Sequence, residues 1–349
     1  DNALGANTTA ANNTAVGSAA LLTNTTGDQN VAVGFAALKV NTTGSDNVAV
    51  GDRSLLANTT GIRNVALGRL TLAANTTASN NTAVGDAALY TNTSGTSNVG
   101  VGFQALYVNT TASSNTAVGY QAMVTNTTGA NNVAIGKDAL QMNTTGASNV
   151  AVGLEALEEN TTASNNTAVG FQALTANTTG TGLTAVGYTA LAANTTGDHN
   201  VALGYNALDA NTEGDRNTGL GTSALGANID GNNNVSVGHN SMVVNSTGTS
   251  NVAVGAYALD ANTTADNNVA IGYTAMTANS TGAQNVALGL AALASNTTAD
   301  YNTALGYQTL YTNSTGADNT GVGHNALIYN TTGSYNTAVG GLALDANTT

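Results

Sequence analysis

Hydrophobic and polar residues recur along this chain with a period of 17 residues. Gly17 and Gly34 begin a series of twenty glycines that continues at this spacing, without a shift, to Gly340. Numbered from Asn13 as position 1, the unit reads Asn-Thr/Val-Ala-Val-Gly-x-x-Ala-Leu-x-x-Asn-Thr-Thr-Gly-x-x. Self-similarity at a fixed short period is typical of repeat architectures, in which each repeat packs only on its neighbours. The pattern therefore predicts a solenoid, and we refer to residues by their position in this unit.

The residues tolerated at each position indicate which side chains face the interior. Position 9 is always Leu or Met, and position 4 is always Val, Ile or Leu, so we expect these two positions to fill the core. All 25 charged residues fall at positions 6, 7, 10, 11, 14, 16 and 17, which we expect to face water because a buried unpaired charge is costly. Position 13 accepts Ile229 while position 14 accepts Glu213, which predicts that position 13 points inward and position 14 outward, as in a strand.

A 17-residue unit is too short for two helices and a turn, and Asn-Thr-Thr-Gly is a poor helix interior. The fold class that we predict is all-β: a tandem-repeat β-solenoid of the β-roll or β-helix type. Residues 1–349 form a single continuous solenoid of about twenty 17-residue rungs. A short helical turn at positions 6 to 11 of each rung is compatible with the pattern. One rung every ~4.8 Å gives a rod on the order of 100 Å long. Both ends are cut mid-repeat, so we expect the segment to be the interior of a longer fibre.

Two Asn positions and two Gly positions are nearly invariant among the repeats. Asn occupies position 12 in all 21 copies, and position 1 departs from Asn only at Leu183. Such columns predict Asn side chains stacked between successive rungs, each amide bonded to its neighbours. We expect Gly at position 5 to mark a positive φ or a close backbone approach. Position 15 relaxes to Ala at residues such as Ala10 and Ala78, which indicates a need for a small residue.

Composition excludes several classes of protein. The chain has no Cys, Pro or Trp, so disulfides and Cys-based metal sites do not stabilise it. Six Lys and Arg against a net charge of −13 leave no basic surface for nucleic acid or an anionic membrane. No run of about 18 apolar residues is present, so we expect no membrane insertion. With 42% hydrophobic residues at fixed spacing, the chain is not expected to be disordered.

Several repeats are similar to those of a known group of proteins. NTAVGYQAM at residues 115–123, NTAVGFQALTANTTG at residues 166–180 and NTALGYQTLYTNSTG at residues 302–316 resemble the repeats of bacterial and phage tail-fibre-domain proteins. The shorter string NVAIG at residues 132–136 and 268–272 resembles repeats in the heads of YadA-like trimeric autotransporter adhesins, whose period is about three residues shorter. The resemblance covers the whole chain and implies a trimeric β-roll in a surface appendage.

No residues suggest catalysis, a cofactor or a metal ion. His199, His239 and His324 lie at positions expected to face solvent and have no repeated acid beside them, so we interpret them as surface residues and name no catalytic residue. The Asp residues lack the spacing of calcium-binding repeats, which leaves no predicted metal site. The glycines are accounted for by the repeat, and no cofactor-binding loop is predicted. We therefore expect no enzymatic activity.

Two further patterns resemble sites of N-glycosylation and of ice binding. Nineteen of the position-12 Asn residues lie in Asn-x-Ser/Thr sequons, the exceptions being Asn211 and Asn228. We favour a structural role for them, because the same Asn recurs where the sequon is broken and a glycan would disrupt a stacked column. The Thr column at position 14 resembles one row of an ice-binding face, but a single row is not a flat two-column face.

Two features suggest association. Position 3 is only Ala, Gly or Ser, so either another subunit or the chain's own return wall must pack over it. Position 6 carries eight of the fifteen aromatic residues, which suit packing against sister chains or stacking on sugars. They are Phe35, Phe103, Tyr120, Phe171, Tyr188, Tyr205, Tyr273 and Tyr307.

The function that we predict is structural. The chain is expected to be the shaft of an extracellular fibre or filament, on a cell surface or a virion appendage, that acts as a stiff spacer and self-associates as a homotrimer or filament. A tip outside this segment would bind a cell-surface glycan or receptor. The alternative is an adhesin module that recognises glycans or a host receptor through its own outer face. Variable outer positions disfavour the alternative, because a repeated ligand site should keep its contacting side chains.

The core assignment of position 9 is testable by substitution. Leu174→Asp should lower the free energy of unfolding by several kcal/mol, because it buries an unpaired charge. Thermal unfolding followed by circular dichroism measures the change, and an unaltered midpoint would show that position 9 is not interior.

Overall fold

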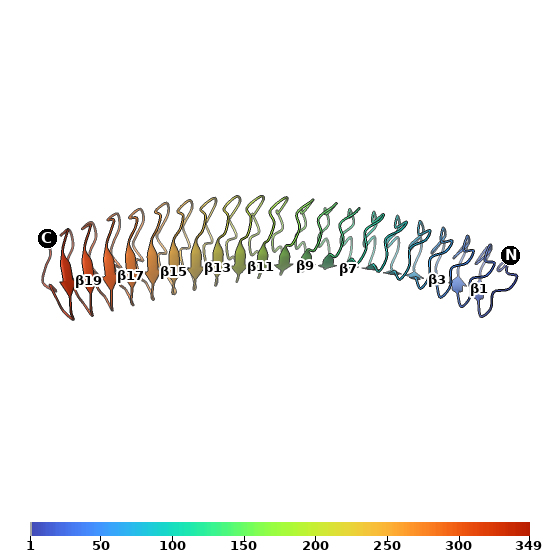
Figure 1. Cartoon of the computed structure of the whole chain (residues 1–349), viewed down its shortest axis with the longest axis horizontal. Coiled ribbons are helices and arrows are strands. Elements are labelled where there is room, and N and C mark those ends of the chain that lie inside the picture. The colour runs from blue at the N-terminus through green and yellow to red at the C-terminus, as the bar shows by residue number, and fades with distance from the viewer. Residues whose placement is uncertain (1) are drawn as a thin grey trace. The chain divides into compact units, whose positions relative to one another are not determined.

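The computed structural model describes residues 2–349 and is an all-β parallel solenoid with one strand in each 17-residue coil. The coils divide into two compact units, unit 1 (Asp1–Thr179) and unit 2 (Gly180–Thr349). Within each unit the strands lie along one side, each beside the next, and are joined by tight turns (Figure 1). The predicted β-solenoid with 17-residue rungs is confirmed.

Unit 1 contains the strands β1 (Thr14–Val16), β2 (Val31–Val33), β3 (Val48–Val50), β4 (Val65–Leu67), β5 (Thr82–Val84), β6 (Val99–Val101), β7 (Thr116–Val118), β8 (Val133–Ile135), β9 (Val150–Val152) and β10 (Thr167–Val169). Unit 2 contains β11 (Thr184–Val186), β12 (Val201–Leu203), β13 (Thr218–Leu220), β14 (Val235–Val237), β15 (Val252–Val254), β16 (Val269–Ile271), β17 (Val286–Leu288), β18 (Thr303–Leu305), β19 (Thr320–Val322) and β20 (Thr337–Val339).

Each strand covers positions 2 to 4 and pairs in parallel with the equivalent strand of the next coil in its unit. In β1 and β2, for example, Ala15 lies opposite Ala32 and Val16 opposite Val33. The register shift is therefore one repeat, so identical positions form continuous columns. Valine and threonine at position 2 and branched residues at position 4 suit this extended backbone, because they pack well on a pleated surface.

The strand faces are the reverse of the sequence-based assignment. From Ala32 to Ala338, position 3 is buried in every coil, whereas position 4 is half-buried or exposed. Our prediction that position 4 fills the core is wrong, although the prediction for position 9 is confirmed, because its Leu and Met side chains are fully buried from Leu21 to Leu327. The interior of each coil thus holds small residues, mostly Ala, at positions 3 and 8 together with the position-9 side chain.

The narrowness of the coil explains why position 3 must be small. A Cβ placed on Gly100, a natural variant at this position, would lie 3.3 Å from both Leu89 Cγ and the carbonyl oxygen of Ala105. These atoms belong to positions 9 and 8 of the same chain, so the strand faces its own return wall. Of the two explanations that we considered for position 3, the return wall is the correct one, and no partner subunit is needed to explain its size.

The return segment, positions 5 to 12, contains turns rather than the short helical turn that the pattern allowed, and no helix occurs in residues 2–349. Positions 7 and 9 have left-handed φ angles, such as +57° at Ala19 and +50° at Leu21. Each left-handed non-glycine residue costs about 1–2 kcal/mol. The left-handed residues direct their backbone amides toward neighbouring coils. Ala36 N donates to Ser18 O in the preceding coil, and Leu38 N donates to Ser54 O in the following one.

Glycine at position 5 satisfies both conditions that we expected. Its φ lies between +126° and +145° throughout the series, a region that side chains with a Cβ avoid. In addition, a Cβ on Gly17 would lie 2.6 Å from the carbonyl oxygen of Gly34 in the next coil. Position 5 therefore needs glycine both for its conformation and for the close approach of successive coils at the end of each strand.

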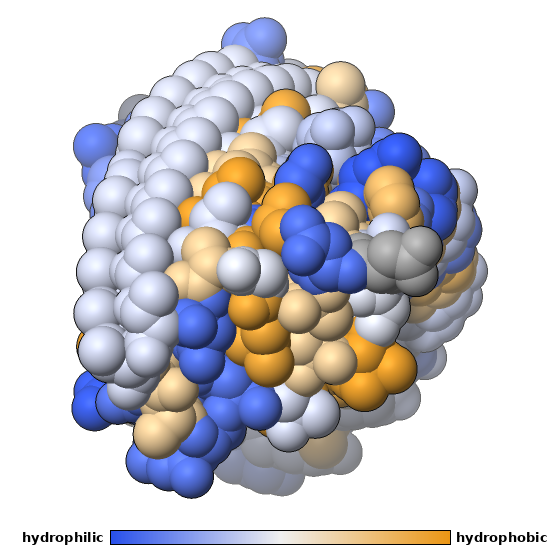
Figure 2. Space-filling model, turned by 90° about the vertical axis from the view of Figure 1, so that its right-hand side faces the viewer, coloured by the Kyte–Doolittle hydropathy of each residue, from blue (hydrophilic) through white to orange (hydrophobic). Residues whose placement is uncertain are grey.

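Positions 13 and 14 both lie at the surface, so the expected inward direction of position 13 is wrong. Thr26 at position 14 is exposed as predicted, while Thr25 at position 13 is half-buried and donates its hydroxyl to Thr42 O at 3.0 Å. The side chain of Ile229 at position 13 is also exposed. Thr columns at positions 13 and 14 thus both run along the surface. Figure 2 shows pale rows of near-neutral hydropathy along one flank.

Adjacent residues of β7 test the direction of the strand faces. Ala117→Gln should lower the free energy of unfolding by about 2–4 kcal/mol, because the larger side chain overfills the interior and buries an amide without partners. Val118→Gln, on the half-buried outer face, should cost less than about 1 kcal/mol. Thermal unfolding of the two variants decides the matter, and a greater loss for Val118→Gln would contradict the observed faces.

Candidate functional surfaces

The position-12 asparagines form a continuous buried column within each unit. The Asn41 amide is fully buried, and its Nδ2 donates both to Asn24 Oδ1 at 2.8 Å and to Gly44 O at 2.8 Å. Asn58 Nδ2 donates in turn to Asn41 Oδ1 at 2.8 Å. Each amide therefore uses both hydrogens and its oxygen without water. The predicted stacking of Asn side chains is confirmed at this position.

A second buried column runs through position 1, at the start of each strand. Asn47 N donates to Asn30 Oδ1 at 3.0 Å, and Asn47 Nδ2 donates to Gly61 O at 2.9 Å. Asn30 Nδ2 donates in the same way to Gly44 O at 2.9 Å. The Gly44 carbonyl therefore accepts from both columns, since Asn41 also donates to it. Both Asn columns therefore donate to the position-15 carbonyl, which connects position 12 with position 1 of the same repeat.

Position 15 is Gly or Ala because it is buried beside the two Asn columns: Ala78 and Ala112 expose only 1% and 4% of their surface. The φ angle at Gly27 is not positive. The position thus needs a small residue rather than a left-handed one, as we predicted.

Burial of the position-12 amides also bears on whether the Asn-x-Ser/Thr sequons can carry glycans. A glycan attached to Asn41 Nδ2 would replace one of the two hydrogens that it donates and would need space that the buried side chain lacks. N-linked glycosylation at the fully buried sites, from Asn24 to Asn330, is therefore incompatible with the folded coils. This result supports the structural interpretation of the sequons.

Position 16 has a role that the sequence interpretation missed. In unit 2, Thr181 N donates to Asp198 Oδ1 at 2.6 Å, and Asp198 N donates to Asp215 Oδ1 at 2.7 Å. Asp215 N continues the series by donating to Asn232 Oδ1 at 2.7 Å. These carboxylates and amides are acceptors for backbone N–H groups rather than free surface charges. The recurrence of Asp, Ser and Asn at this position was the available signal, since these side chains commonly accept from nearby backbone amides.

The outer face of the strands is apolar and free of charge. Positions 2 and 4, which project from this face, contain only Thr, Val, Ile and Leu along the whole chain. Leu203, Leu288 and Leu305 at position 4 have 50%, 42% and 40% of their surface exposed. Large exposed apolar areas are uncommon on monomeric proteins and usually mark interaction surfaces.

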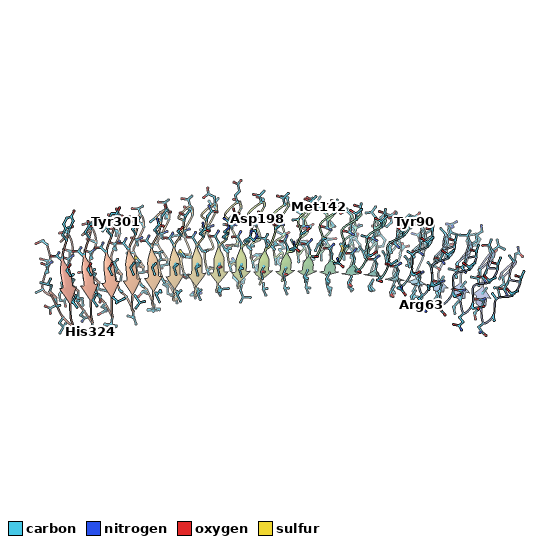
Figure 3. The ribbon with its side chains drawn as sticks, in the orientation of Figure 1. Arg63, Tyr90, Met142, Asp198, Tyr301 and His324 are labelled. Carbon is cyan, nitrogen blue, oxygen red and sulfur yellow. The ribbon has the colours of Figure 1, made fainter. Side chains whose placement is uncertain are left out.

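The predicted column of position-6 aromatics lies at the surface, and all eight side chains are exposed. Neighbouring rings stack where successive coils both carry one, as do Phe103 and Tyr120 with centroids 5.3 Å apart. His324 continues this column by stacking on Tyr307 at 5.2 Å, and Figure 3 shows it projecting from the strand side of unit 2. The spacing of the coils is thus close to the spacing at which aromatic rings stack.

The three histidines are exposed, as predicted, and none lies in a cleft: the surface of residues 2–349 has no pocket. Within the same residues, no three His, Asp or Glu side chains are grouped so that they could hold a metal ion. Nor do these residues contain a helix with the length and apolarity needed to cross a bilayer.

Lys137, Glu158 and Asp209 have shifted pKa values, and the first two belong to one group of charges with Asp138 and Glu155. The hydrogen bond and charge of Asp138 raise the pKa of Lys137, whose Nζ lies 2.6 Å from Asp138 Oδ2. Burial, followed by the charge of Glu155, raises the pKa of Glu158. Burial also raises the pKa of Asp209, against backbone hydrogen bonds that lower it. Glu158 and Asp209 both lie at position 10, where only Asp260 and Asp345 are also acidic, so most coils lack such a group and it does not define a site repeated along the chain.

Comparison with models of protein families and with characterised proteins gives no match for this chain.

Replacing an Asn of the position-12 column by Asp should destabilise the protein much more than the same replacement at an exposed position. Asn143→Asp removes the donor to Asn126 Oδ1 and Gly146 O and buries a carboxylate against these oxygens, which should cost about 3–5 kcal/mol. Asn131→Asp makes the same change at an exposed residue and should cost less than about 0.5 kcal/mol. Chemical denaturation at neutral pH measures both, and equal stability of the two variants would show that the column does not stabilise the fold.

Proposed function

We propose that the chain is a structural shaft, a stiff spacer within a surface fibre or filament. The observation that carries the proposal is that successive coils in each unit are bonded by backbone pairing and by two columns of buried Asn amides. Bending a unit would stretch these bonds and expose the amides, and a buried polar group that loses its partner costs about 1–3 kcal/mol. This resistance to bending is the property that a stiff spacer requires.

The repetition of the fold supports the same role. Each coil adds about 4.8 Å to the stack. The positions that maintain the stack, such as 1, 5, 9 and 12, are nearly invariant among the repeats, whereas positions 6, 7 and 10 vary. Among the repeats, the positions that set length and rigidity therefore vary less than most of the surface. The resemblance to fibre repeats supports an extracellular or virion location.

The alternative, an adhesin that binds glycans or a receptor through its outer face, is favoured by one observation. The position-6 aromatics are exposed, and the stacked pair Tyr188 and Tyr205, with centroids 5.1 Å apart, offers a flat aromatic edge. Exposed rings of this kind can pack on apolar faces of sugars. Several coils lack an aromatic at position 6, such as those with Ser18, Asp52 and Thr222, so the column does not repeat one ligand site.

A pair of variants separates a spacer from an adhesin. Deletion of residues 64–97, two complete coils of unit 1, should preserve the β-type circular dichroism spectrum and shorten the native fibre by about 10 Å in electron micrographs. Replacement of residues 64–97 by a copy of residues 98–131 should leave the length unchanged.

If the chain is a spacer, the fibre should still attach to its target surface after the replacement, because the length of the fibre is the same. Loss of attachment at native length would overturn the spacer proposal, since the function would then depend on side chains of particular coils.

A further inference from the structure

We infer that unit 2 contains a built-in opening point, which lies between the coil that begins at Leu183 and the coil that begins at Asn200. We call this place the Leu183 junction. Among the interior coils of unit 2, these two are expected to separate most readily. The inference goes beyond the spacer proposal, which concerns length and rigidity, and it applies to the isolated chain.

The position-1 side chain normally accepts a backbone hydrogen bond from the following coil. In unit 2, Asn217 N donates to Asn200 Oδ1 at 2.8 Å, and Asn234 N donates to Asn217 Oδ1 at 3.0 Å. The series continues in this way to Asn336 N, which donates to Asn319 Oδ1 at 3.0 Å. Each of these bonds joins two successive coils at the start of their strands.

Leu183 interrupts this series, because its side chain has no oxygen. It is buried, with 1% of its surface exposed, and it precedes Asn200 by one repeat. Asn200 is also fully buried, and within residues 2–349 its backbone N–H has no hydrogen-bond acceptor. From Asn217 to Asn336, by contrast, every position-1 N–H is paired. A buried backbone N–H without a partner is rare and costs free energy comparable to a lost hydrogen bond.

The loss at Leu183 is one-sided, which makes it costly. A position-1 Nδ2 usually donates to the position-15 carbonyl, as Asn217 Nδ2 does to Gly231 O at 2.7 Å. Leu183 offers no such donor to Gly197 O, but that carbonyl still accepts from Asn194 Nδ2 at 3.0 Å. The Asn200 N–H keeps no such substitute. Apolar burial of Leu183 stabilises its own coil, yet it does not replace the missing acceptor.

The adjacent strand pairing is longer than elsewhere in unit 2. Thr184 N, in β11, donates to Asn200 O at 3.0 Å. The equivalent bonds from Val201 to Thr320 measure 2.8 or 2.9 Å. In a solenoid each coil contacts only its neighbours, so stability is approximately a sum of nearest-neighbour interactions. Local opening occurs where these interactions are weakest, which in unit 2 is the Leu183 junction.

The position-12 column continues through the Leu183 junction. Asn211 Nδ2 donates to Asn194 Oδ1 at 2.9 Å, so the two coils stay joined there while the strand side is weakened. Opening should therefore begin between β11 and β12. In a shaft, bending strain would be released at this point, a consequence that rests on the spacer proposal, whereas the opening itself does not.

Hydrogen exchange of single backbone amides in the full chain tests the inference, because it measures local opening. Thr184 N and Gly204 N donate across the Leu183 junction, whereas Thr218 N and Gly238 N occupy the same positions at the junction between the coils beginning at Asn217 and Asn234. Relative to unfolded-chain rates, we expect Thr184 and Gly204 to exchange at least tenfold faster than Thr218 and Gly238. Fraying from the C-terminus would give the opposite order. Equal protection of the two pairs would overturn the inference.

Two substitutions test the cause. Leu183→Asn supplies the missing acceptor and should slow exchange at Thr184 at least tenfold, to the rate of Thr218. Asn217→Leu removes the acceptor of Asn234 N and should accelerate exchange at Thr218 by a similar factor. If Leu183→Asn leaves Thr184 unchanged, or Asn217→Leu leaves Thr218 unchanged, the position-1 residue does not set the opening point and the inference fails.

The double variant Leu183→Asn, Asn217→Leu is the matched control, since it has the composition of the wild type. It should move the fast exchange from Thr184 to Thr218 while its circular dichroism spectrum stays the same. Fast exchange that remains at Thr184 would contradict the inference. Should a variant fail to fold, the comparison of amides within the wild type still decides. The spacer proposal, tested by fibre length, stands or falls separately.

Discussion

Hydrogen bonding between successive coils is the interaction on which the rest of this structure depends. The coil interior is too thin to bury many large side chains, and it consists mainly of Ala at positions 3 and 8 with one Leu or Met. Buried apolar area alone therefore stabilises each coil weakly. The two Asn columns add amides whose donors and acceptors are satisfied within the protein, as at Asn41 and Asn47, and only the coil with Leu183 lacks the position-1 Asn. Low local dielectric strengthens such bonds and penalises any gap among them.

The need for hydrogen bonds between coils also explains the left-handed φ angles of the return segment. A helical return segment would satisfy its amides internally and leave the coils unconnected there. Left-handed residues at positions 7 and 9 instead direct amides to the neighbouring coils, as in Ala36 and Leu38. Their strain, about 1–2 kcal/mol each, is offset by bonds that would otherwise be lost. Position 5 brings the coils close enough for this bonding, which a side chain at Gly17 would prevent.

A thin interior also determines the outer surface. Because position 3 accepts only Ala, Gly or Ser beside Leu, the branched residues of the strands are displaced to the outside, where Leu203 and Leu305 remain exposed. The minimal cross-section of the coil, which suits a structural element, thereby also creates an exposed apolar face on the strands.

The sequence by itself determined the period of 17, the β-solenoid class, the inward position of Leu174 and the stacked columns of Asn41 and Asn47. It also placed the charges outward, except that Asp138 is buried and bonded to Lys137 and Gln141. These features follow from the types of residue that recur, because burial of an unpaired charge or amide is costly whatever the exact geometry. Only the tertiary structure decided which face of the strand is interior. Ala117 and Val118 alternate, so a choice that is wrong by one residue inverts the whole face. Hydrophobicity favours Val118 for the core, but the distance to the return wall admits only Ala117, and that distance is a property of the closed coil that no single repeat specifies.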